Sequence, residues 1–142
     1  MSRFVLSLSA LVALIGLVGC GSSGPDLVIA KGKIVKGGNP LPITRPEIGV
    51  GSLQLQLTPE AGAAGLEPEV TRAKEDGTFE FIGEGKGIKP GTYRLSVLHF
   101  QDGPPVDKLN GAFGPQNTPL KVTIAADKGA THDLGTIDLD KP

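Results

Sequence analysis

The segment SLQLQLT at residues 52–58 decides the fold class, because apolar and polar side chains alternate along it without a break. In an extended strand its three leucines would share one face and its two glutamines the other. A period of two residues is typical of a strand with one buried side and one solvent-facing side. No segment after residue 20 repeats apolar residues at the spacing of an amphipathic helix, so the chain is predicted to be all-β.

Six further segments show the same alternation and are separated by turn-forming residues. The segment at 92–100 carries apolar groups on both faces, which predicts a strand in the centre of a sheet. In the last segment Leu134 and Ile137 lie three residues apart around Gly135, which predicts a β-bulge. The predicted strands are residues 27–36, 52–58, 69–74, 78–82, 92–100, 120–125 and 132–139.

Seven short strands in a chain of 142 residues predict a seven-stranded antiparallel Greek-key β-sandwich. The chain holds 21 Gly and 12 Pro, about 23% together against a usual ~12%, close to the range typical of disorder. Many of these residues fall in the turns between alternating segments. The excess therefore favours a strand-rich domain over a disordered one.

The charge balance and the residue inventory exclude several functions. Fourteen basic and 15 acidic residues leave no polybasic surface for nucleic acid, and a lone cysteine forms neither an internal disulfide nor a zinc cluster. His99 and His132 belong to different predicted strands, so we expect no metal site there and two solvated or half-buried side chains. Five acidic residues lack the calcium-loop spacing and are expected to be solvated: Glu84, Asp102, Asp107, Asp138 and Asp140.

The first residues carry a targeting signal. Arg3 precedes an apolar run at residues 4–18, which is shorter than the ~20 residues of a membrane span. A basic start, a short apolar segment and small residues at its end are typical of a secretory signal.

The tetrapeptide Leu17-Val18-Gly19-Cys20 resembles the lipobox of bacterial lipoproteins. This resemblance implies that the Cys20 thiol receives a diacylglycerol and that the helical signal peptide, residues 1–19, is then removed. The freed amine is often acylated as well in that family. Two or more acyl chains give stable membrane anchoring, whereas one chain binds only marginally.

Residues 20–26 are expected to form a flexible tether, because Gly, Ser and Pro follow Cys20. At ~3.5 Å per residue at most, this tether would hold a domain at residues 27–142 close to the membrane. Gly21, in place of the Asp that retains lipoproteins in the inner membrane, resembles the outer-membrane class of Gram-negative bacteria. We therefore expect an exported protein anchored to the cell envelope.

Three segments resemble the carboxypeptidase regulatory-like domain, which has a transthyretin-like (prealbumin) fold. They are KGKIV with GNPLP (31–35 and 38–42), EDGTFEF (75–81) and KPGTYRLSV (89–97), within a match over residues 27–139. The motif positions are Asp76, Gly77, Phe79, Phe81, Pro90, Gly91 and Tyr93. The resemblance implies a seven-stranded sandwich with a non-enzymatic binding or structural role.

Two of these motifs also have a physical reason of their own. Asp76-Gly77 supplies the positive φ of a tight turn, which predicts a hairpin between residues 69–74 and 78–82. Tyr93 follows the Pro90-Gly91 corner, and we expect its hydroxyl to hydrogen-bond back to the turn backbone, as in a tyrosine corner.

The inventory argues against the enzymes known on this fold. Transthyretin-like hydrolases end in Tyr-Arg-Gly-Ser, whereas this chain ends Asp-Leu-Asp-Lys-Pro, and intradiol dioxygenases need two tyrosines where this chain has one. We therefore expect no catalytic residue, metal or cofactor. The leading prediction is a membrane-anchored binding or structural module, with a protein or a glycan as the candidate partner of its loops or strand edges. The alternatives are a small carbohydrate-binding domain, disfavoured by the absence of Trp, and an enzyme with an unrecognised site.

The connection at residues 101–119 is long for a compact domain. Val106, Leu109 and Phe113 are expected to pin it to the sandwich. We favour a packed crossover between the two sheets over a contact loop anchored by Phe113.

Overall fold

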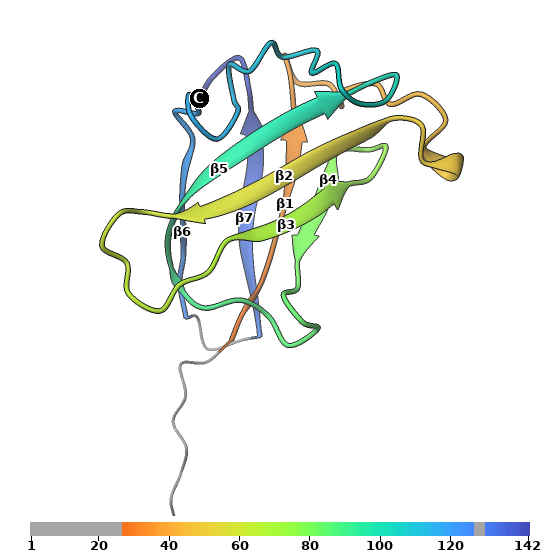
Figure 1. Cartoon of the computed structure of the whole chain (residues 1–142). Helices are drawn as coiled ribbons and strands as arrows, with labels where there is room; N and C mark the ends of the chain where they lie inside the picture. Colours follow the sequence, from red (N-terminus) through yellow and green to blue (C-terminus); the bar gives the residue numbers. More distant parts are fainter. Residues whose placement is uncertain (1–26, 127–129) are drawn as a thin grey trace, which may run out of the picture.

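The computed structural model describes residues 27–126 and 130–142 (Figure 1). The predictions for the signal peptide, Cys20 and the tether lie outside these residues. The described chain forms seven strands and one short 3₁₀ helix. They are β1 (Ile29–Val35), η1 (Pro46–Ile48), β2 (Ser52–Pro59), β3 (Glu69–Ala73), β4 (Thr78–Phe81), β5 (Gly91–Phe100), β6 (Lys121–Ile124) and β7 (Thr131–Asp138).

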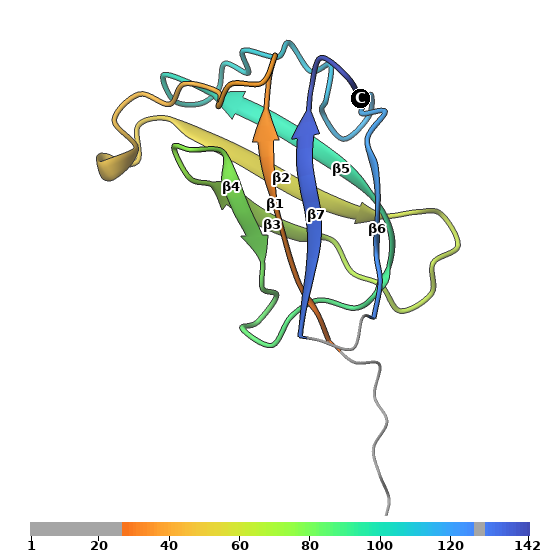
Figure 2. The ribbon, with the colours of Figure 1, turned by 180° about the vertical axis from the view of Figure 1, so that it is seen from behind.

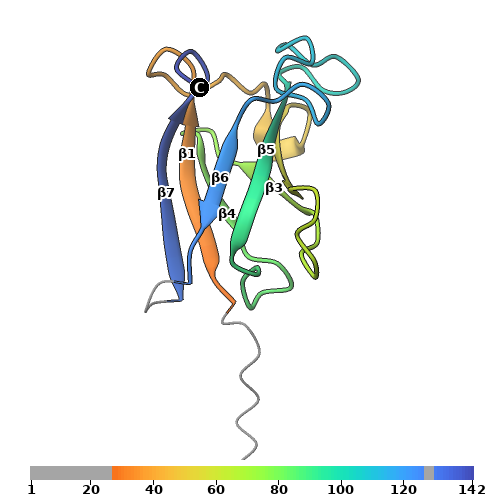
Figure 3. The same ribbon diagram turned by 90° about the vertical axis from the view of Figure 1, so that its left-hand side faces the viewer.

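The strands form two facing sheets, as the alternation predicted (Figure 3). The smaller sheet has the order β4-β1-β7 and the larger one β3-β2-β5-β6, with β5 in the interior of its sheet as expected. Each of the seven predicted strands is confirmed to within two residues at either end. The three leucines of β2 are fully buried against the other sheet, while the glutamines between them are half-buried.

The prediction of a wholly antiparallel sandwich is wrong for one pair of strands. β1 and β7 run parallel, with Ile29 beside Thr131 and Val35 beside Asp138. Both strands run from the end where the described chain begins toward the end where it finishes (Figure 2). Local alternation reports which face of a strand is buried, but carries no information about the direction of a partner far away in the sequence.

The bulge predicted around Gly135 is confirmed. Lys31 pairs with Asp133 and Lys33 with Thr136, so two residues of β7 stand opposite Gly32. Gly135 adopts a φ of 70°, and its N–H donates to Asp133 Oδ1 at 2.9 Å. The extra residue moves Ile137 back to the face that points at the core, where it is partly buried.

The hairpin predicted across Asp76-Gly77 is wrong, although its turn is present. β3 belongs to the larger sheet and β4 to the smaller one, so the turn joins two sheets. Gly77 has a φ of 84° and donates its N–H to the Lys74 carbonyl at 2.9 Å. Its own carbonyl accepts the Ile34 N–H at 2.9 Å. Turn chemistry fixed the local geometry, whereas packing against β1 decided which sheet the next strand joined.

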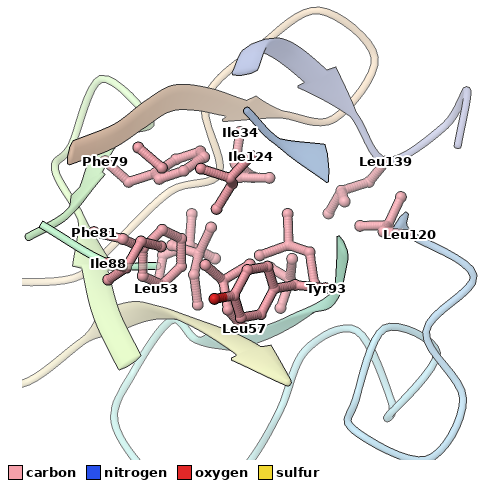
Figure 4. Close-up of a cluster of buried hydrophobic side chains, with 14 of the residues drawn as sticks. Ile34, Leu53, Leu57, Phe79, Phe81, Ile88, Tyr93, Leu120, Ile124 and Leu139 are labelled. Atoms are coloured by element: carbon pink, nitrogen blue, oxygen red, sulfur yellow. The ribbon is translucent and has the colours of Figure 1, made fainter. Parts of the chain in front are cut away.

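The core lies between the sheets and draws on both of them (Figure 4). Phe79 and Phe81 meet edge to face, with ring centroids 5.7 Å apart and planes at 72°. The largest fully buried side chains are Tyr93, Phe79, Phe81, Ile34, Leu53, Leu55, Leu57, Leu95, Ile124, Val28 and Val97. Both phenylalanines of the family-like motif are thus core residues.

Candidate functional site

The two ends of the sandwich are built differently. The described chain begins at Leu27 at one end (Figure 1). The connections at residues 36–51 and 101–120 gather at the opposite end, together with the carboxyl terminus (Figures 1 and 2). We call this second end the loop end. Because binding residues concentrate on loops held by a rigid scaffold, it is the candidate contact site of the domain.

The connection at residues 101–119 is packed, but it is not the predicted crossover between sheets. β5 and β6 are neighbours in the same sheet and pair only from Gly91 to Arg94. Beyond that pairing the connection runs along the edge of β5. The Val97 N–H donates to the Phe113 carbonyl at 2.8 Å, and the Leu95 N–H to the Leu120 carbonyl at 3.0 Å. The connection thus takes over the edge of β5 where β6 is too short to cover it.

The residues predicted to pack this connection against the sandwich do so only in part. Leu109 and Phe113 pack against the core, which confirms two of the three expected contacts. Val106 is 58% exposed, so the prediction was wrong for this residue. The partial burial of Phe113 also removes it as a protruding anchor.

Asp107 organises the connection, a role that the sequence reasoning missed. Its Oδ1 accepts the N–H of His99 at 2.9 Å and that of Leu109 at 3.0 Å, and its Oδ2 accepts the N–H of Gly111 at 2.9 Å. Three backbone donors on one carboxylate satisfy polar groups that would otherwise be buried without partners. The available signal was an Asp followed shortly by Asn-Gly, a pattern that favours side-chain-capped turns.

The two connections of the loop end are bonded to each other. The Thr44 N–H donates to the Gln101 carbonyl at 2.9 Å, and the Thr44 hydroxyl donates to Asp102 Oδ1 at 2.8 Å. Lys108 forms an ion pair with Asp102 Oδ2 at 3.2 Å. The hydrogen bond from Thr44, followed by the one from Lys108, lowers the pKa of Asp102. The loop end is therefore a preorganised surface, which costs little ordering entropy when it binds.

His99 departs from the solvated or half-buried state expected of it. Its side chain is 4% exposed, and its Nε2 lies 2.6 Å from the Pro42 carbonyl. Because a carbonyl only accepts, Nε2 must carry the proton, and the imidazole ties β5 to the connection at residues 36–51. His132 is half-buried on β7, as expected. The two histidines lie on strands of different sheets, His99 on β5 and His132 on β7.

A shallow cavity of about 420 Å³ opens beside His99, with Pro40, Leu41 and Pro42 along one wall. Two lysines stand at its rim, and both are in ion pairs: Lys36 with Asp140, and Lys108 with Asp102. Its apolar walls and neutralised rim suit a contact surface better than a reaction centre.

Of the five acidic residues expected to be solvated, Glu84, Asp102 and Asp140 are exposed, whereas Asp107 and Asp138 are half-buried and accept backbone N–H groups. Asp138 accepts the N–H of Gly37 at 2.9 Å and that of Asp140 at 3.1 Å. The backbone N–H of Asp140, followed by that of Gly37, lowers the pKa of Asp138. Among the described residues no three His, Cys, Asp or Glu side chains gather in a way that would hold a metal ion.

The hydroxyl of Tyr93 makes the hydrogen bond predicted for it. It donates to the Lys89 carbonyl at 2.7 Å, across the corner that precedes β5. A cavity of about 210 Å³ lies beside it, at the end that carries Leu27, and is also lined by Glu67, Glu69 and Glu84. Burial, followed by repulsion from the other two glutamates, raises the pKa of Glu69. Burial also raises the pKa of Tyr93.

Exposed apolar side chains mark the tips of the two bonded connections. Ile48, the last residue of η1, is 65% exposed, while Val106 is 58% exposed. Arg45 precedes η1 with a left-handed φ of 46°, and its carbonyl accepts the N–H groups of Ile48 and Val50. Constrained loops that carry exposed apolar groups are typical of recognition surfaces.

No family model matches the chain, and comparison with curated proteins and with solved structures finds no significant match. Within residues 27–126 and 130–142, no helix has the length and apolar character needed to cross a bilayer.

Proposed function

We propose that this chain is a lipid-anchored protein of the bacterial cell envelope, carrying a non-enzymatic β-sandwich of the carboxypeptidase regulatory-like type. Cys20 at the end of a short apolar segment, as the sole cysteine of the chain, is the observation that carries the proposal. The lipobox resemblance gives that position its chemistry. Acylation of the thiol and then of the freed amine would anchor the protein stably.

The family resemblance is supported by where its motifs fall. The segment at 31–35 lies in β1, the segment at 75–81 covers the turn between the sheets and β4, and the segment at 89–97 leads into β5. The tyrosine corner at Tyr93 and the buried Phe79 and Phe81 give these motifs a structural reason. A Greek-key path through the seven strands is part of the same proposal.

The two ends of the domain are arranged as a surface-exposed binding domain would need. A tether of a few residues would bring the Leu27 end close to the bilayer and leave the loop end pointing away from it. The exposed apolar tips at Ile48 and Val106 would then face a protein or glycan of the envelope. Placement of the functional surface away from the anchor favours a binding role.

A non-enzymatic role is supported by how the reactive side chains are used. The only tyrosine donates its hydroxyl to a backbone carbonyl. His99 is buried and bonded to Pro42, and Asp107 holds three backbone N–H groups. Groups committed in this way hold the fold together and are not poised to transfer a proton.

The anchor is tested by Cys20→Ala, with Ser22→Ala in the neighbouring tether as the matched control. Expressed in a bacterium, the wild type and Ser22→Ala should sediment with membranes and be released by detergent. Cys20→Ala should keep its signal peptide and lose the acyl chains. Globomycin, which blocks the lipoprotein signal peptidase, should cause the wild type to accumulate as the uncleaved precursor.

Processing of Cys20→Ala at the wild-type rate, with no change in its acylation, would overturn the proposal. Insensitivity of the wild type to globomycin would do the same.

A further inference from the structure

The outward faces of the two sheets carry different charge. The four strands of the larger sheet contain one acidic residue, Glu69, which stands opposite Leu57 and so points toward the inner side. The outward positions include Gln54, Gln56, Arg72, Arg94, Lys121 and Thr123. We call this surface the cationic face.

On the outward face of the smaller sheet, positive and negative side chains are balanced. Its outward-facing Lys31 stands between Glu80 of β4 on one side and Asp133 of β7 on the other. Cross-strand neighbours of opposite charge at this spacing attract one another and offset each other's field. The cationic face therefore differs from its counterpart in lacking acidic partners on its own strands.

The cations form a diagonal stripe. Arg72 stands beside Gln54 on one flank, and Arg94 stands beside Lys121 on the other, in register with Thr58. Strands about 4.8 Å apart and residues about 3.4 Å apart place Arg72 and Lys121 on the order of 20 Å from each other. Figure 1 looks onto this face, and the connections between strands gather around its edges.

The three cations of the stripe differ in how far their donors are already engaged. Arg72 forms no ion pair within 4.0 Å in the described part of the chain, and Arg94 donates one bond, from Nη2 to the Thr118 carbonyl at 3.3 Å. Lys121 is paired with Glu60 at 2.6 Å in an exposed position, where a competing anion can replace its partner. The guanidinium groups suit bidentate binding of carboxylates.

We infer that the cationic face binds an acidic polysaccharide, a chain of sugars bearing carboxylates. This inference rests on the proposed placement in the cell envelope. Arginines at the two flanks match the carboxylates, while the side-chain amides of Gln54 and Gln56 between them match the sugar hydroxyls. Of the outward positions on its four strands only Val70, Leu98 and Phe100 are apolar, and Phe100 lies at the end of β5. The face therefore has neither the central aromatic anchor that dominates protein interfaces nor a continuous apolar band that would insert into a bilayer.

The test uses the full chain in detergent and measures binding to polygalacturonate, with neutral dextran as the uncharged control. The double variant Arg72→Glu/Lys121→Glu reverses two charges on the cationic face. Lys31→Glu/Lys33→Glu makes the same charge change on the smaller sheet and is the matched control. Arg72→Glu alone guards against a folding defect, because this side chain is exposed and lies on an edge strand.

We expect the wild type to bind polygalacturonate and not dextran, and binding to weaken as salt rises. The double variant should bind about tenfold more weakly, Arg72→Glu alone about threefold, and the control at the wild-type level. An equal loss of polygalacturonate binding in the double variant and in the control would overturn the inference.

Binding of poly-L-glutamate or of phosphatidylglycerol vesicles without binding of polygalacturonate would overturn it in favour of an acidic protein or a membrane. Failure of the inference leaves the anchor untouched, since Cys20→Ala is scored by processing and acylation.

Discussion

The two sheets of this sandwich follow the same alternation but are assembled in different ways. The larger sheet is regular and antiparallel throughout, and β2 and β5 lie in register over eight residue pairs. The smaller sheet joins the first strand to the last in parallel, across a bulge, and adds the four-residue β4. The regular sheet thus forms one side of the core, and the irregular sheet packs against it from the other side.

Apolar burial differs between β7 and the two central strands of the larger sheet, β2 and β5. β2 and β5 contribute Leu53, Leu55, Leu57, Leu95 and Val97, each fully buried. β7 contributes Leu134 and Ile137, which are only partly buried. Ile34, Phe79 and Phe81 are also fully buried, so β1 and β4 share the core with the larger sheet. The difference teaches that β7 adds less apolar burial than the central strands, while its parallel pairing with β1 closes the topology.

Truncation of a core leucine in the regular sheet should have the largest effect. Leu55→Ala removes a fully buried side chain and is expected to cost about 2–5 kcal/mol of unfolding free energy. Ile137→Ala, at a partly buried position of β7, should cost less. Urea denaturation monitored by circular dichroism measures both variants. An equal or larger loss of unfolding free energy in Ile137→Ala would contradict the lesser burial assigned to β7.

The bulge should be the most sensitive point of the irregular sheet. A Cβ on Gly32 would lie 2.8 Å from Phe79 Cζ and 3.0 Å from the Gly135 carbonyl oxygen. Gly32→Ala is therefore expected to cost about 1–3 kcal/mol through overpacking.

Gly135→Ala is the matched control for that variant, since its Cβ would meet open space but its φ is 70°. It should cost about 1–2 kcal/mol through backbone strain alone. A core that accepts Gly32→Ala without loss would show that β1 and β7 do not approach as closely as described.

Loss of the tyrosine corner, near the start of β5, should have a smaller effect on stability. Tyr93→Phe keeps the buried ring and loses the hydrogen bond to the Lys89 carbonyl. The expected cost is about 1 kcal/mol, or roughly 3–5 °C in the melting temperature. Calorimetry on the wild type and the variant measures this difference. An unchanged melting temperature would remove the corner as a stabilising feature.

The turn between the sheets should carry a small pH dependence. Hydrogen bonds from the Thr78 hydroxyl and then from its backbone N–H lower the pKa of Asp76 below its ordinary value. A folded-state pKa below the unfolded value of about 3.9 contributes stability above that pH, and the contribution is lost as the pH falls through the folded-state pKa.

Asp76→Asn should therefore be less stable than the wild type near pH 7. The difference in unfolding free energy between the two proteins should narrow below about pH 4. Denaturation midpoints across this range measure it. A gap that widens on acidification would contradict the assigned hydrogen bonds.

Much of the fold was predictable from the sequence, because burial of one face leaves a period of two in every strand. The SLQLQLT segment fixed its strand, and Leu134, Gly135 and Ile137 located the bulge. The parallel pairing of β1 and β7 was not predictable, since these strands are the first and last of the domain and no local pattern links them.

The candidate site was less predictable than the fold. The hydrogen bond of Tyr93 follows from its place after the Pro90-Gly91 corner and could be anticipated. The burial of His99 and the three N–H groups on Asp107 depend on how two distant connections fold against each other. Such contacts leave no periodic signal, because they arise only once the scaffold has formed.

Mass spectrometry of the amino-terminal tryptic peptide, from protein extracted from membranes, tests the central claim most directly. The account predicts a peptide that begins at Cys20, ends at Lys31 and carries a diacylglyceryl group on the thiol. A chain that retains residues 1–19, or that begins elsewhere with an unmodified cysteine, would contradict the claim that this protein is held to the membrane by lipid.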